Sequence, residues 1–144
     1  MLHYKAACLV LTCYNDENLR ILSVSRKTDP NAIGLPGGGI EQDETPLQAA
    51  IRETYEETGI TINPNRCVPI YEAIDSTGIG VITYLHMGSL DAVAVSKEQG
   101  IVRWVEPIEL WTTGPFVEYN KMVLVEMYRR VFSWHPQLGR LVNP

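Results

Sequence analysis

A run of glycines followed by a fully bounded helix constrains the fold more than any other part of the sequence. Residues 37–39 are three consecutive glycines, which permit backbone conformations that other residues avoid. An N-cap, a first-position proline and a capping-box partner mark the start of the helix: Thr45, Pro46 and Gln48. Gly59 is typical of the residue that ends a helix. The sequence therefore predicts a glycine-rich loop and then a helix over residues 46–58.

Three glutamates share one face of this predicted helix. Glu53, Glu56 and Glu57 are spaced i, i+3 and i+4, which places their carboxylates side by side. Like charges at this spacing cost a helix roughly 0.2–0.5 kcal/mol per pair, and the helix dipole disfavours acids near the C-terminal end. Local helix stability therefore does not explain the arrangement. The stripe that we expect to face the core consists of Leu47, Ala50, Ile51, Thr54 and Thr58.

The net charge of the chain is concentrated around this helix. The chain has 12 Lys and Arg against 17 Asp and Glu, a net charge of −5, and residues 41–57 contain six of the acids and one of the bases. An exposed acidic face is one interpretation, but the shared face, the preceding glycines and the single cation favour a metal site. Because the cluster offers carboxylates without His or Cys, it suits Mg²⁺ or Mn²⁺ better than zinc. Such a site indicates chemistry on phosphate groups.

Composition argues against several other classes of protein. A pI near 5.1 and the lack of a basic run make generic nucleic-acid binding unexpected. No stretch approaches the roughly 20 apolar residues that cross a bilayer, so we expect no membrane association and a cytoplasmic protein. The spacing of Cys8, Cys13 and Cys67 fits neither CxxC nor a zinc pattern, and we expect reduced, mostly buried cysteines.

The remaining elements predict an α/β fold with one mixed sheet between helices. Residues 29–31 are expected to open a loop, and a second long helix is expected to begin around residues 113–115 and to end at His135. We expect one domain over residues 1–144, with a short irregular tail from about residue 136. The predicted strands cover residues 6–12, 19–24, 67–74, 80–87 and 101–105.

The segment from Gly38 to Ile60, GGIEQDETPLQAAIRETYEETGI, resembles the Nudix box, GX5EX7REUXEEXGU, in which U is a bulky aliphatic residue. The one departure is Thr54 at the first U position, where its methyl group can still pack on the core face. The matching fixed positions are Gly38, Glu44, Arg52, Glu53, Glu56, Glu57, Gly59 and Ile60. The resemblance implies a Nudix-type α/β/α sandwich that hydrolyses a nucleoside diphosphate linked to another moiety X with Mg²⁺ or Mn²⁺.

The resemblance also implies roles for individual residues. Glu53, Glu56 and Glu57 would be metal ligands, and the Gly38 region would supply a backbone carbonyl or a tight turn beside them. Arg52 would orient a box glutamate and belong to the catalytic set.

Two further glutamates have roles of a different kind. Glu44 would support the loop and helix electrostatically. The box does not decide which residue is the general base: Glu53 is the first choice, and Glu98, before the predicted strand at residues 101–105, is the candidate outside the box.

Substrate choice is expected to come from residues outside the box. Arg26 could contact a phosphate and Asn120 could read a base edge, although both could also be ordinary structural residues. We expect a (d)NTP, damaged nucleotides included, to be cleaved to a nucleoside monophosphate and pyrophosphate. An ADP-ribose, nucleotide-sugar or dinucleoside polyphosphate hydrolase is the alternative enzyme, and a non-catalytic nucleotide-binding module is the alternative of another class. A homodimer is compatible with the sequence. The aromatic residues that could stack a base, or simply fill the core, are Tyr4, Tyr84, Trp104 and Trp111.

Overall fold

The computed structural model describes residues 3–91 and 102–134, with the side chains of residues 131–134 excepted. Five strands precede the first helix, and no βαβ unit is repeated among the described residues. In chain order they are β1 (Ala6–Val10), β2 (Thr12–Asn15), β3 (Asn18–Arg26), β4 (Asp29–Gly34), β5 (Gly37–Gly39), α1 (Pro46–Thr58), a 3₁₀ turn (Pro64–Arg66), β6 (Cys67–Ile74), β7 (Gly80–His86), β8 (Val102–Val105), α2 (Pro107–Thr112) and α3 (Val117–Trp134).

The strands form two sheets, whereas the sequence had led us to expect one. The first has the order β5-β1-β7-β6, with β1 and β7 parallel and the other pairs antiparallel. The second is antiparallel, with β3 paired to β2, β4 and β8. Residues 6–15 pass from one sheet to the other at Leu11, whose carbonyl accepts from Leu22 N–H. The expected strand over residues 6–12 is therefore two strands, while the mixed α/β character is confirmed.

One further local expectation was wrong, and one short helix was not predicted. Asp29–Gly34 is a strand rather than a loop, and Pro30 is tolerated there because β4 is an edge strand and needs no donor on its outer side. The segment before α3 holds the short helix α2, which begins at Pro107 with a capping box between Glu106 and Glu109. It is too short to display the period by which a helix is found in a sequence.

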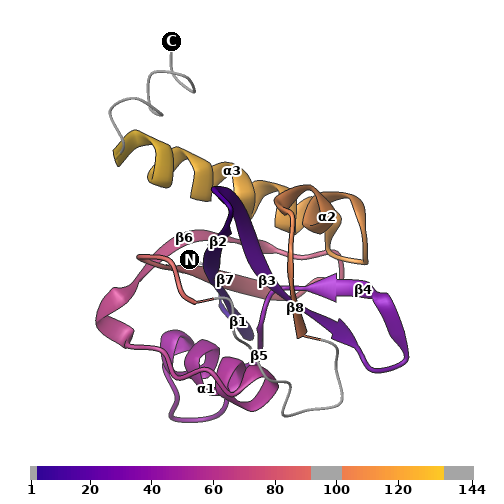
Figure 1. Ribbon diagram of the computed structural model, residues 1–144. Helices are drawn as coiled ribbons and strands as arrows, with labels where there is room; N and C mark the ends of the chain where they lie inside the picture. The colour runs from indigo at the N-terminus through magenta and orange to yellow at the C-terminus, as the bar shows by residue number, and fades with distance from the viewer. Residues whose placement is uncertain (1–2, 92–101, 135–144) are drawn as a thin grey trace.

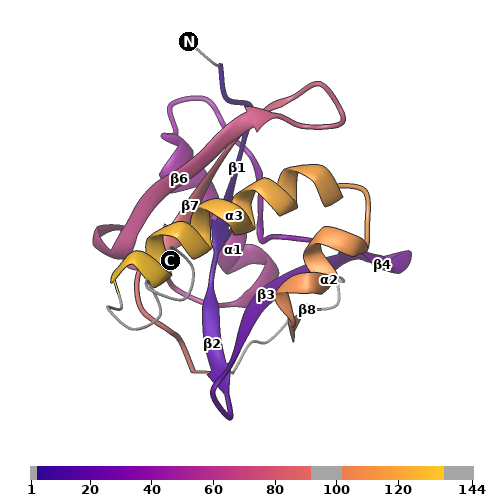
Figure 2. The same cartoon turned by 90° about the horizontal axis from the view of Figure 1, so that it is seen from above.

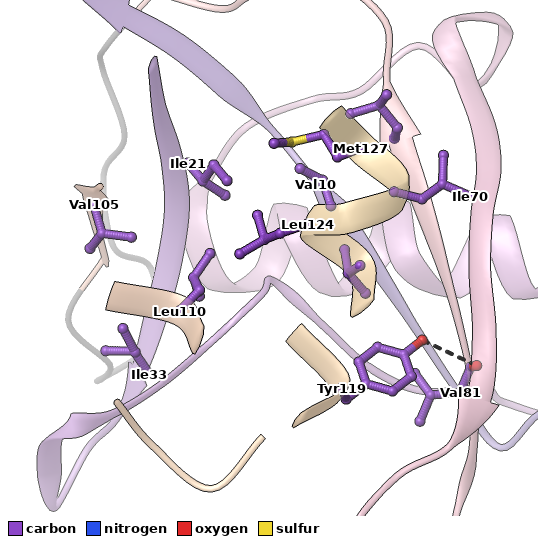
Figure 3. Close-up of a cluster of buried hydrophobic side chains, with 12 residues drawn as sticks. Val10, Ile21, Ile33, Ile70, Val81, Val105, Leu110, Tyr119, Leu124 and Met127 are labelled. Atoms are coloured by element: carbon purple, nitrogen blue, oxygen red, sulfur yellow. Dashed lines mark hydrogen bonds between the residues drawn. The ribbon is translucent and has the colours of Figure 1, made fainter. Parts of the chain in front are cut away.

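Helices cover the strands on two opposite sides, as Figures 1 and 2 show, with α1 on one side and α2 and α3 on the other. The alternation of side chains along β1 supplies both cores. Ala7 and Leu9 are buried with Ala49 and Ala50 of α1, and Val10 is buried in the cluster under α2 and α3. Figure 3 shows that second cluster, with Leu110, Leu124 and Met127 facing Val10 and Ile21.

Helix α1 begins and ends where its sequence signals predict. Thr45 Oγ1 accepts from Gln48 N–H, Gln48 Oε1 accepts from Thr45 N–H, and Gly59 ends the helix with φ 81°. Thr54 is fully buried at the atypical box position, and its hydroxyl donates to Ala50 O at 2.7 Å, so no polar atom is left unpaired. The core face differs slightly from expectation, because Ala49 is buried and Leu47 and Ile51 are only partly buried.

The packing of α1 brings the glycine run to the glutamates. β5 pairs with β1 through Ala7 and Gly38, and α1 packs across both strands. The glycines therefore lie under the carboxylate face of the helix. In the described ranges, no helix is both long enough and apolar enough to span a membrane.

Candidate active site

Arg52 ties the start of the box to the glycine strand. Its Nε donates to Glu44 Oε2 at 2.7 Å and its Nη2 donates to Glu44 Oε1 at 3.0 Å, a two-point contact suited to the planar guanidinium. Nη2 also donates to Gly39 O at 2.9 Å. The hydrogen bonds from Arg52, together with one from Glu41 N–H, lower the pKa of Glu44 to about 2. Glu44 is therefore an anionic anchor for the guanidinium at neutral pH.

The other end of the Arg52 guanidinium reaches the glutamates of α1. Nη1 donates to Glu53 Oε1 at 3.0 Å and lies 3.3 Å from Glu56 Oε2. The Arg52 side chain is 25% exposed and that of Glu53 is 20% exposed, so these contacts are partly shielded from water. The hydrogen bond to Glu44 in particular raises the pKa of Arg52 above its ordinary value. Arg52 thus offsets the like-charge repulsion along the helix face.

The glycine strand lies directly against two of the glutamates. Gly37 N–H donates to Glu57 Oε1 at 2.8 Å. A Cβ placed on Gly38 would lie 2.6 Å from Glu53 Cδ, which is closer than side-chain carbons approach. Gly37 has a φ of +154°, and a Cβ there would meet the backbone of Ala7 and Cys8. The backbone therefore requires glycine at position 37, and glycine at position 38 leaves room for the Glu53 carboxylate.

A small cavity of about 190 Å³ opens beside the same glycines. Pockets that enclose drug-sized ligands have volumes of roughly 300–1,000 Å³. The smaller volume here suits one ring system of a ligand rather than a whole one. Its walls come from β1, β5, β7, the loop after β6 and the start of α3. The lining residues that matter below are Gly37, Gly38, Cys8, Asp75, Phe116, Tyr119 and Asn120.

A model of the NUDIX domain matches residues 3–126. This chain belongs to the Nudix family. A MutT-like protein of Streptomyces ambofaciens is 33% identical over 94 residues, which are 65% of this chain and 60% of that protein. Diphosphoinositol polyphosphate phosphohydrolase 2 of Mus musculus is 38% identical over 71 residues, or 49% of this chain and 38% of that protein. The Nudix chain thus spans 38–60% of the length of these two relatives.

Solved structures support the Nudix fold. The NUDIX domain of Shewanella oneidensis NrtR, solved as a complex with ADP ribose, has a TM-score of 0.68 at 20% identity over 88% of this chain and 90% of that one. A C. elegans Ap4A hydrolase, solved as a binary complex, has a TM-score of 0.68 at 22% identity over 84% and 94%. At these identities the likeness establishes the fold.

The donor set of this Nudix box fits a hard divalent cation. Glu53, Glu56 and Glu57 offer carboxylate oxygens, and the backbone of Gly38 adjoins the Glu53 carboxyl group. Within residues 3–91 and 102–134, no three acidic, imidazole or thiol side chains converge as a finished metal cluster. Arg52 holds Glu53 and Glu56, while Glu57 accepts from Gly37. A bound cation would draw these carboxylates closer together, and the hydrogen bonds from Arg52 and Gly37 do not exclude it because a carboxylate has about four acceptor positions.

Of the two residues expected to contact the substrate, Asn120 lines the 190 Å³ cavity and Arg26 does not. Asn120 is 3% exposed, lines the 190 Å³ cavity, and donates from Nδ2 to Leu110 O at 3.3 Å. Arg26 is exposed at the end of β3, beside the turn to β4, and is absent from the cavity lining. Glu98 lies outside the described residues, as does the tail expected from about residue 136.

Four residues of the cavity were not expected at a site from the sequence. Asp75 lies in the turn between the expected strands at residues 67–74 and 80–87, where an Asp is ordinary and gives no signal of a site. Cys8 was expected only to be a reduced, buried cysteine, and Cys8, Cys13 and Cys67 are free thiols in the structure. Phe116 and Tyr119 form the aromatic wall, and neither had been singled out for stacking. The aromatic residues that had been singled out, Tyr4, Tyr84, Trp104 and Trp111, pack against the two cores.

A larger cavity of about 640 Å³ lies away from the glycine strand and the box glutamates. It is lined by Thr12, Arg66, His86 and Gly88, among others. The pairing of β1 with β7 places Val81 beside Ala6, at the glycine end, and Leu85 beside Val10, at the opposite end. Size alone would select this cavity, but none of its lining residues belongs to the box.

Proposed function

We propose that this chain is a Mg²⁺- or Mn²⁺-dependent nucleotide pyrophosphohydrolase that cleaves a nucleoside diphosphate linked to X. The preferred substrate is a (d)NTP, damaged nucleotides included, with a nucleoside monophosphate and pyrophosphate as products. The observation that carries the proposal is the meeting of Gly38, Glu53 and the 190 Å³ cavity. A nucleotide with its base in the cavity then has its phosphates close to the carboxylate face.

Different residues would bind the cation, accept the proton and position the carboxylates. Glu53, Glu56 and Glu57, with the Gly38 carbonyl, would hold the cation. When bound, the cation supplies charge neutralisation for the diphosphate and a more acidic water. Glu53 accepts the proton of the attacking water, and Glu98 is the alternative base. Arg52 positions the carboxylates of Glu53 and Glu56 through the hydrogen bonds described above.

The charge of the cavity argues for a nucleotide over an inositol polyphosphate, the kind of substrate named for the mouse relative. An inositol ring carrying several phosphates needs several Lys or Arg side chains to bind it. The described lining of the 190 Å³ cavity contains none, and it contains the carboxylate of Asp75. An uncharged base can bind against these walls without electrostatic repulsion from Asp75.

A neighbouring cavity favours a dinucleoside polyphosphate as the second candidate substrate. It has a volume of about 450 Å³ and shares Asp75, Phe116 and Tyr119 with the first cavity. Its walls include Ile74, which is 63% exposed, and Met122, which is 40% exposed. These apolar groups offer a contact surface for a second base next to the first cavity.

The test is a product analysis with purified protein, Mg²⁺ or Mn²⁺, and a panel of (d)NTPs, ADP-ribose and dinucleoside polyphosphates. We expect pyrophosphate from (d)NTPs, abolished in Glu56→Gln and in Glu57→Gln, with the melting temperature unchanged or slightly raised. Glu72→Gln, which alters an exposed glutamate on β6, is the matched control and should behave like the wild type. Turnover near the wild-type rate in both site variants would refute the metal site.

The other outcomes separate the alternatives. Hydrolysis of ADP-ribose alone, or of dinucleoside polyphosphates alone, would replace the (d)NTP assignment and keep the reaction class. Nucleotide binding without turnover of any substrate would favour a non-catalytic nucleotide-binding module.

A further inference from the structure

Asp75 stands at the end of β6 with one carboxylate oxygen fully engaged. Its Oδ1 accepts from Thr77 N–H at 2.8 Å, from the Thr77 hydroxyl at 2.6 Å and from Ile79 N–H at 3.1 Å. Burial opposes ionisation, but the hydrogen bonds from Thr77 and Ile79 outweigh it and lower the pKa of Asp75. The carboxylate is therefore anionic at neutral pH and fixed in orientation.

The second oxygen of Asp75 is free to meet a ligand. In the part of the chain that the structure describes, Oδ2 accepts no hydrogen bond, and the residue lines both the 190 Å³ and the 450 Å³ cavities. Its negative charge contributes to raising the pKa of the Cys8 thiol and of the Tyr119 phenol, although burial is the main cause at both. Both groups line the 190 Å³ cavity, so the charge of Asp75 acts within it.

Two other polar side chains of the cavity, Tyr119 and Asn120, already make hydrogen bonds within the protein. Tyr119 OH contacts Thr83 Oγ1 at 2.8 Å and Val81 O at 3.2 Å, so it is already satisfied. Because Asn120 Nδ2 donates to Leu110 O, the amide orientation is fixed, and Oδ1 has no partner among the described residues. Asp75 and Asn120 both line the cavity beside the aromatic wall, and each has an acceptor oxygen, Oδ2 and Oδ1 respectively, without a partner among the described residues.

We propose that Asp75 is a specificity-determining residue that selects nucleotides whose base carries an exocyclic amino group, over those with a carbonyl at the same position. The inference rests on the proposed function, because a nucleotide cleaved beside Gly38 has its base in this cavity. An amino group donates to Oδ2 of Asp75. A carbonyl oxygen in its place sets two acceptors against each other and leaves the carboxylate unpaired.

Cytosine and uracil nucleotides test this choice with almost no change of shape. They carry an amino group and a carbonyl, respectively, at position 4 of the same ring. We expect kcat/KM of the wild type to be about tenfold or more higher for CTP than for UTP, with the difference mainly in KM. Equal kcat/KM values, or a preference for UTP, would overturn the proposal without any variant having to fold.

Asp75→Asn replaces the second acceptor oxygen with a hydrogen-bond donor and preserves the hydrogen bonds of the turn. The amide oxygen can accept from Thr77 and Ile79 as Oδ1 does, and the amide NH₂ then donates into the cavity. We expect the CTP:UTP ratio to fall at least tenfold, toward or below one. A purely structural Asp75 would lower both rates together and leave the ratio unchanged, which would refute the assignment.

Asp29→Asn is the matched control. Asp29 makes a similar turn, in which its Oδ1 accepts from Asn31 N–H at 3.0 Å, but it is exposed and lies outside the cavity lining. The same chemical change there should leave the CTP:UTP ratio at the wild-type value. A shift equal to that of Asp75→Asn would also count against the proposal.

Binding measurements separate this inference from the proposed function. CMP and UMP carry the same bases without a bond to cleave, and their dissociation constants can be measured by calorimetry without metal. Tighter binding of CMP that is lost in Asp75→Asn would support base selection even if no nucleotide were hydrolysed. Equal binding of CMP and UMP, or binding of neither, would refute it even if (d)NTPs were hydrolysed.

Discussion

Alanine substitutions at three adjacent glycines should give three different results. Gly38→Ala places a methyl carbon 2.6 Å from Glu53 Cδ, whereas unbonded carbons settle about 3.5–4.0 Å apart. The Glu53 carboxyl group must therefore move by about 1 Å. A displacement of that size away from Arg52 breaks the 3.0 Å hydrogen bond from Nη1. Because misplacement of a catalytic group by 1 Å costs about 100-fold, we expect kcat to fall by about that factor.

The same substitution should leave the fold almost unchanged. The clash is with the end of a side chain, and an off-rotamer Glu53 costs about 0.5–1.5 kcal/mol. Replacing Gly by Ala returns about 0.4–1 kcal/mol through the unfolded chain. The net change is about 1 kcal/mol or less, which is a melting-temperature shift of about 4 °C at most. Gly38→Ala also retains the backbone carbonyl, so a lost rate would report on Glu53.

The neighbouring glycines serve as controls in opposite directions. A Cβ on Gly39 would have Lys5 O at 3.9 Å as its nearest neighbour, so Gly39→Ala should match the wild type in rate and stability. Gly37→Ala should unfold the protein or destabilise it by about 3 kcal/mol or more, because the methyl meets the backbone of β1. Steady-state kinetics with thermal denaturation check all three. Gly38→Ala with nearly normal kcat, or Gly39→Ala with an equal loss, would refute the argument.

Three further predictions concern stability and reactivity. The pKa of Glu44 is about 2 in the folded protein against an ordinary 4.5. The ionised Glu44 therefore stabilises the fold fully above pH 4.5, and this stabilisation is lost as the pH falls from 4.5 to 2. The difference in the free energy of unfolding between the wild type and Glu44→Gln should shrink through this pH range. Thr45→Ala removes the capping box of α1 and should lower the free energy of unfolding by about 1 kcal/mol, measured by urea denaturation. Burial, followed by the charges of Glu57 and Asp75, raises the pKa of Cys8 to about 12, so iodoacetamide at pH 7.5 should modify it far more slowly in the native than in the denatured protein, as mass spectrometry would reveal.

The sequence predicted the helix well because its signals are local. Thr45, Gln48 and Gly59 act on atoms within four residues along the chain, so their contacts follow from spacing alone. The prediction for the sheet was less successful, because the division at Leu11 depends on which strands come to pair on either side of it. Pro30 suggested a loop for a similar reason, since its tolerance in β4 depends on the position of that strand at a sheet edge.

The cavity could not be found from spacing, because its polar groups come from separate elements. Gly38, Asp75 and Asn120 meet only after β5 pairs with β1, β6 returns to β7, and α3 packs across the sheet. In the sequence, Asp75 is fully explained by its turn, and this explanation is correct for Oδ1. A turn needs only one of the two carboxylate oxygens, however. The fold directs this residue to the cavity, so one side chain can hold the loop and also be available to a base.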